Sequence, residues 1–132
     1  MATFLWVIFG GAIGTGARFG LSGWAAHRWG ETFPWGTIII NITGCFIISL
    51  FAGLTGPDGR WIVNTTGRQF FLVGICGGYT TFSSYSFQTL TLARDGEWLL
   101  AAGNVIGSNI SCLIAVWLGF FLANLINNSG RA

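Results

Sequence analysis

Residues 69–93 form a run of 25 residues without a charged side chain. A run of this length can cross a bilayer as a helix. Its middle, Gly74–Ser86, contains a Gly-Gly pair followed by two threonines. Glycine costs about 1 kcal/mol relative to alanine inside a helix, and threonine adds a smaller cost. The run therefore predicts either a helix broken at membrane depth, where freed backbone groups can bind an ion, or a close-packing site built on the G-x-x-x-G pair Gly74 and Gly78.

The composition of the whole chain indicates an integral membrane protein. Of the 132 residues, 52% are hydrophobic and only 8% are charged, whereas a soluble domain carries about 25% charged residues. We expect an all-α membrane protein with one domain, residues 1–132, and four transmembrane helices, of which the third is broken. The expected spans are residues 4–24, 35–54, 70–92 and 98–126. A net charge of +2, scattered along the chain, argues against a nucleic-acid partner.

Polar residues recur at helical spacing within these spans. Thr37 and Asn41 are four residues apart and so share a face of the second span. Two longer stripes comprise Phe82, Tyr85, Ser86 and Thr89 in the third span, and Asn104, Ser108, Ser111 and Cys112 in the fourth. Such stripes either pack helices together or line a polar pathway, and the position of the first stripe directly after the predicted break favours the pathway. The three cysteines, Cys45, Cys76 and Cys112, are interpreted as small packing residues.

The arginines provide evidence about the ion pathway and about the orientation of the chain in the membrane. Arg18, inside the first span, either snorkels to the interface or supplies a fixed positive charge in a water-filled mouth. The basic residues of the two sides are nearly balanced, with Arg60, Arg68 and Arg131 opposite Arg28 and Arg94. The positive-inside rule then gives almost no bias, so the chain can insert both ways. Because four short helices can hardly enclose a pathway, two oppositely inserted copies are expected to pair through glycine-lined faces.

Three stretches make a family resemblance specific. They are G-G-A-I-G-T-G-A-R at Gly10–Arg18, P-W-G-T-I-I-I-N-I-T-G at Pro34–Gly44 and G-G-Y-T-T-F-S at Gly77–Ser83. In this order and spacing the chain resembles the small Fluc-type fluoride channels of bacteria over nearly its whole length. The resemblance implies an antiparallel, dual-topology homodimer in the bacterial inner membrane, with two fluoride pathways and passive, electrogenic export that confers resistance to fluoride.

The resemblance also implies roles for individual residues. A structural sodium ion on the two-fold axis would be held by the backbone carbonyls of Gly77 and Thr80, and Arg18 would be the vestibule arginine. Phe82 matches the first phenylalanine of the family's aromatic pair, but the second is Tyr85 here, and Gln88 stands where some members carry a carboxylate. The expected fluoride pathway comprises Thr37, Asn41, Phe82, Ser83, Tyr85, Ser86, Ser108 and Ser111.

Two other function classes are weighed against a channel. A small proton-coupled exporter of the multidrug type has a similar size but depends on a carboxylate within the membrane. All four acids here (Glu31, Asp58, Asp95 and Glu97) are expected in loops. A non-transporting assembly subunit would not need a broken span or polar stripes. An enzyme is not expected, because no nucleophile–base pair or metal-ligand cluster is evident and His27 is the only histidine.

Overall fold

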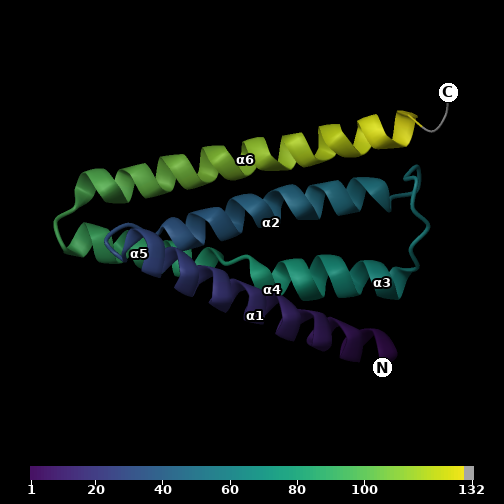
Figure 1. Ribbon diagram of the computed structural model, residues 1–132, viewed down its shortest axis with the longest axis horizontal. Coiled ribbons are helices and arrows are strands. Elements are labelled where there is room, and N and C mark those ends of the chain that lie inside the picture. The colour runs from purple at the N-terminus through teal and green to yellow at the C-terminus, as the bar shows by residue number, and fades with distance from the viewer. Residues whose placement is uncertain (130–132) are drawn as a thin grey trace.

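A computed structural model describes residues 1–129, and all its regular elements are helices. They are α1 (Ala2–Trp29), α2 (Trp35–Leu54), α3 (Thr65–Gln69), the π-helical segment η1 (Phe70–Cys76), α4 (Gly77–Tyr79), α5 (Phe82–Arg94) and α6 (Trp98–Ser129). The helices run roughly side by side, and the start of α1 and the end of α6 lie at the same end of the bundle (Figure 1). The predicted all-α fold is confirmed.

Three of the helices, α1, α2 and α6, are long and apolar enough to cross a membrane. The fourth crossing is the bent one, formed by α3, η1, α4 and α5. Helix α2 has the bounds of the expected second span, whereas α1 and α6 extend beyond theirs at the ends. The extent of the membrane domain stays a prediction, and Arg131 of the orientation count lies outside the described residues.

The third span breaks where the glycine–threonine stretch predicts. Thr80 (φ −79°, ψ 158°) and Thr81 (φ −152°, ψ 111°) are extended, with helix on either side. The close-packing interpretation of the same stretch is also correct. A Cβ atom added to Gly74 would lie 2.8 Å from the Val7 carbonyl oxygen, and one added to Gly78 would lie 2.6 Å from that of Gly11. The glycines therefore allow this span to pack closely against α1. Its helix ends directly afterwards, at Tyr79.

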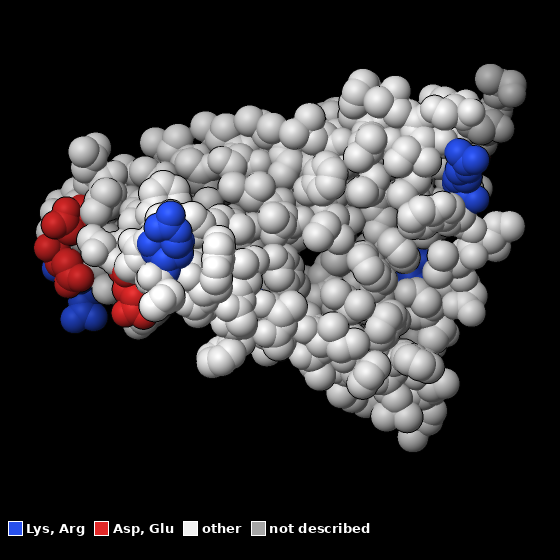
Figure 2. Space-filling model, viewed as in Figure 1, with Lys and Arg blue, Asp and Glu red and all other residues white. Residues whose placement is uncertain are grey.

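Helices α2 and α6 form one extensive helix–helix contact, and α1 packs against the bent third span in another. The most buried side chains of the core include Ile40 of α2, with Asn104 and Ala123 of α6. The outer surface is apolar: large side chains such as Phe19 (83% exposed) and Trp117 (69%) face outward. Charged side chains gather toward the two ends of the face in Figure 2, with an uncharged stretch between them. Such a surface suits a lipid environment, because hydrocarbon cannot solvate charge.

Candidate ion pathway

Asn41 of α2 connects that helix to the break in the third span. Its Nδ2 donates to the Thr81 carbonyl oxygen (3.0 Å), and its Oδ1 accepts from the Thr81 amide (2.8 Å). One side-chain amide thus satisfies both backbone groups of a residue that has left the helical pattern. Since an unpaired backbone group at membrane depth is costly, Asn41 explains how this chain tolerates an extended segment there.

The break deprives two carbonyls of their helical donors. In a continuous helix the Thr81 amide would bond to the Gly77 carbonyl, but it donates to Asn41 Oδ1 instead. Likewise the Ser84 amide, which would bond to the Thr80 carbonyl, donates to Thr81 Oγ1 at 3.2 Å. The carbonyls of Gly77 and Thr80 are therefore left without these partners. They are the oxygen atoms that a hard cation would need.

Arg18 of α1 is directed at the same region. Its Nε donates to the Gly78 carbonyl oxygen at 3.2 Å, and Thr15 Oγ1 donates to the same oxygen at 3.4 Å. The side chain is half-buried. The guanidinium therefore lies beside the break. Its predicted role in a vestibule remains a prediction.

A groove of about 300 Å³ opens beside the break, between α2, α5 and α6. It is lined by Asn41, Cys45 and Ile48 of α2, by Thr80, Thr81, Phe82 and Tyr85 around the break, and by Ser108, Asn109 and Cys112 of α6. No charged side chain is among these described residues. The groove therefore offers amides, hydroxyls and aromatic edges without a full charge of either sign.

Two aromatic rings form one wall of the groove. The ring centroids of Phe82 and Tyr85 are 5.3 Å apart, and Phe82 is 76% exposed in the single chain. The Tyr85 hydroxyl oxygen accepts a hydrogen bond from Asn109 Nδ2 at 2.9 Å. Asn109 was not predicted from the sequence, although it directly follows Ser108 in the polar stripe.

A hydrogen-bonded chain joins α5 to α6 next to the groove. Asn104, only 1% exposed, donates through Nδ2 to Thr89 Oγ1 (2.8 Å), and its Oδ1 accepts from Ser108 Oγ (3.1 Å). Buried amides whose donors and acceptors are paired in this way fix two helices relative to one another. Part of the polar stripe on α6 therefore serves packing.

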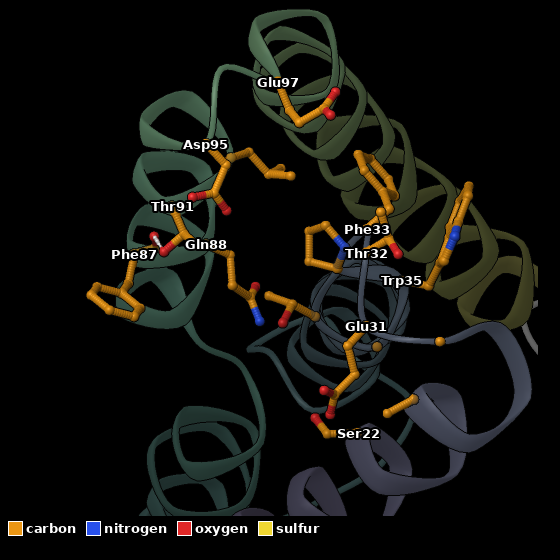
Figure 3. A pocket seen from close by; sticks show the side chains of 16 residues that line it. Ser22, Glu31, Thr32, Phe33, Trp35, Phe87, Gln88, Thr91, Asp95 and Glu97 are labelled. Carbon is orange, nitrogen blue, oxygen red and sulfur yellow. Dashed lines mark hydrogen bonds between the residues drawn. The ribbon is translucent and has the colours of Figure 1, made fainter.

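A second, larger cavity of about 610 Å³ lies at the end of the bundle that holds the α1–α2 and α5–α6 connections. Its lining includes three carboxylates, Glu31, Asp95 and Glu97, together with Thr37 and Gln88. Figure 3 shows the Gln88 side chain extending from α5 into this space, with Asp95 at the C-terminal turn of the same helix. Gln88 Oε1 is the one buried side-chain oxygen or nitrogen without a hydrogen-bond partner in the described chain. We call this space the outer cavity.

The structure divides the predicted pathway residues between these two spaces. Asn41, Phe82, Tyr85 and Ser108 meet at the groove, whereas Thr37 lines the outer cavity. Thr37 lies one helical turn before Asn41, and Gln88 lies about one turn after Tyr85, so the two spaces follow one another along α2 and α5. Ser83, Ser86 and Ser111 line neither of the two; Ser86 Oγ donates to the Phe82 carbonyl oxygen of its own helix at 2.9 Å.

Comparison with known proteins matches the chain to a family over most of its length. The model of the CrcB-like protein family, also described as camphor resistance, covers residues 5–120. The chain belongs to the CrcB-like family. It is therefore a multi-pass membrane protein, in agreement with its three apolar spans and one bent span.

Similar curated proteins share about half of the residues over the full length. The chain is 58% identical to the fluoride-specific ion channel FluC of Rhodospirillum rubrum, over 95% of this chain and 97% of the relative. It is 54% identical to the FluC proteins of Opitutus terrae (97% of each chain) and of Paramagnetospirillum magneticum (96% of this chain, 99% of the relative). The resemblance inferred from three short stretches thus extends along the whole chain.

Proposed function

We propose that this protein is a fluoride-selective ion channel that exports fluoride passively and electrogenically, and so protects a bacterial cell from its toxicity. The observation that carries the proposal is the identity of more than 50% over nearly the full length of relatives named as fluoride-specific ion channels. Because these relatives are named as ion channels, the family supports transport rather than catalysis.

The chemistry of the groove suits this anion. Fluoride holds its water strongly, so entry into a narrow pathway requires replacement hydrogen-bond donors. The Asn41 amide, hydroxyl groups and the partly positive edges of the Phe82 and Tyr85 rings can supply them. A full positive charge beside the ion would hold it too tightly, and conduction needs binding that is weak enough to leave.

The proposal is tested with purified protein in liposomes loaded with fluoride, with an ionophore that makes potassium permeant. A fluoride electrode should record fast release that depends on the ionophore, while matched liposomes loaded with chloride retain it. Release that requires a proton gradient would instead favour a coupled exporter, and absence of release would favour an assembly subunit. A coupled exporter would need a carboxylate within the membrane, but all four acids lie outside the helices and none lines the groove.

We also propose that a structural sodium ion is held on a two-fold axis by the carbonyls of Gly77 and Thr80. Both carbonyls have lost their helical donors, and unwound backbone carbonyls are suitable sodium ligands. A Cβ atom on Gly77 would meet nothing within 4 Å, so a second chain has room to approach. Once bound, the ion would supply fixed positive charge between two pathways. Fluoride release should be lost in sodium-free medium; unchanged release would contradict the sodium site.

The proposed assembly is an antiparallel homodimer in the bacterial inner membrane. Glycines on the outer faces of α1 and α6, among them Gly16, Gly20, Gly103 and Gly107, have open space where a Cβ would lie. Such faces permit close approach of another helix. Light scattering of the detergent-solubilised protein should give the mass of two chains. A unique surface tag should be labelled from both sides of the membrane; labelling from one side alone would rule out dual topology.

A further inference from the structure

The hydroxyl groups that line the groove differ in whether they donate a hydrogen bond within the protein. Of the four hydroxyl-bearing residues in its lining, three donate within the protein: Thr80 Oγ1 to the Cys76 carbonyl (3.0 Å), Thr81 Oγ1 to Ser84 Oγ (3.1 Å) and Ser108 Oγ to Asn104 Oδ1 (3.1 Å). A hydroxyl has one hydrogen to donate. These three are therefore committed to the protein itself.

Tyr85 carries the fourth hydroxyl, which accepts a hydrogen bond within the protein but donates none among the described residues. Its oxygen accepts from Asn109 Nδ2 at 2.9 Å, and among residues 1–129 no acceptor is recorded for its hydrogen. Asn109 Nδ2 also donates to the Val105 carbonyl oxygen at 2.7 Å, so both amide hydrogens of Asn109 are in use. Asn109 thus holds Tyr85 in place and leaves the phenolic hydrogen for an acceptor in the groove.

We propose that the Tyr85 hydroxyl, positioned by Asn109, donates a hydrogen bond to the permeating fluoride. The inference rests on the proposed channel function. Accepting a bond from an amide polarises the phenol and makes its hydrogen a better donor. Hydrogen bonds to an ionised acceptor are short and strong, and fluoride is the strongest hydrogen-bond acceptor among the halides. Asn109 is a positioning residue, since it acts through Tyr85.

The test measures fluoride efflux over a range of fluoride concentrations, because the half-saturating concentration reports binding separately from the maximum rate. Tyr85→Phe keeps the ring and removes the donor, and it should raise the half-saturating concentration at least about tenfold, the effect of one lost hydrogen bond to a charged acceptor. Asn109→Leu should shift it in the same direction by a smaller factor. The double variant should match Tyr85→Phe, because Asn109 has no separate role in binding.

Tyr79→Phe is the matched control. The Tyr79 hydroxyl bonds to Thr43 Oγ1 at 2.8 Å, and Tyr79 does not line the groove. This variant should keep the wild-type half-saturating concentration. A wild-type value in Tyr85→Phe, with fluoride still released, would overturn the role of the hydroxyl and leave the channel function intact. Additive shifts in the double variant would overturn the positioning role of Asn109. A wild-type protein that releases no fluoride would overturn the channel function and this inference together.

Discussion

The groove and the outer cavity follow one another along α2 and α5, yet they differ in charge. The groove has no charged residue in its described lining, whereas the outer cavity has three carboxylates. The carboxylates belong to connections at the end of the bundle, where water can solvate them, and the groove lies beside the break within the helices. For an anion, the three carboxylates would oppose entry through the outer cavity, whereas the groove would offer hydrogen-bond donors without a full charge.

In the proposed channel, this difference would let a chain with few charges handle a strongly hydrated anion. The groove presents amide and hydroxyl dipoles that the fold holds in position. The Asn41 side chain stabilises the break by bonding to both backbone groups of Thr81. Changes to the groove should therefore impair transport more strongly than changes to the outer cavity, which should only adjust its rate. The following predictions examine that contrast in order of decreasing effect.

Replacing Asn41 with leucine should have the largest effect. The amide and carbonyl of Thr81 would lose their partners, at about 1–3 kcal/mol for each group left unpaired. We expect a destabilised break and loss of fluoride release, measured by thermal unfolding in detergent and by efflux from liposomes.

Asn127 provides a matched control for Asn41. Its Oδ1 accepts from the Arg60 amide (2.9 Å) and its Nδ2 donates to the Gly53 carbonyl (3.1 Å), so it also bonds two backbone groups, but far from the groove. Asn127→Leu should reduce thermal stability while retaining fluoride release. Equal loss of release in both variants would show that Asn41 matters only for stability.

Replacing Asn104 with alanine should have an intermediate effect. The variant loses the bonds to Thr89 and Ser108 in a site that is 1% exposed, which should lower the stability by about 1–3 kcal/mol. Fluoride release should slow without vanishing, because α5 is loosened and the donors stay in place. Asn124→Ala, an exposed asparagine of the same helix, is the control and should leave the melting temperature unchanged. A melting temperature of Asn104→Ala equal to wild type would contradict the packing role.

Neutralising the outer cavity should have the smallest effect. The triple variant Glu31→Gln, Asp95→Asn, Glu97→Gln removes the repulsion that an approaching anion meets. Fluoride release should rise by up to about threefold near 10 mM salt, and the gain should disappear at high salt, where the Debye length is short. A gain that persists at high salt would indicate that the carboxylates act at short range instead.

The sequence predicted much of this arrangement because the responsible signals are local. Glycines and threonines in an uncharged run indicate a break wherever the rest of the chain lies, and Asn41 stands out because an amide is costly in an apolar span. Its partner Thr81 could not be predicted, since the bond joins residues 40 positions apart on different elements. The same holds for Asn109 and Tyr85, which are 24 positions apart.

Helical spacing alone did not show where one space ends and another begins. Thr37 and Asn41 share a face of α2 as predicted, but the packing of α5 against them assigns one to the outer cavity and the other to the groove. Cys45 and Cys112, interpreted as packing residues, line the groove as well. Such assignments depend on which neighbouring helix covers each turn, and a single helix does not encode that information.

The most direct test of the contrast is the fluoride efflux rate of Phe82→Ile beside that of Phe87→Ile. Both phenylalanines lie on α5 and are similarly exposed (76% and 69%), but only Phe82 lines the groove, while Phe87 belongs to the outer cavity. Phe82→Ile should lower the rate at least about tenfold with the protein still folded, because an aliphatic side chain lacks the partly positive ring edge. Phe87→Ile should conduct like the wild type. Normal efflux through Phe82→Ile, or equal losses in both variants, would contradict passage of fluoride along the groove.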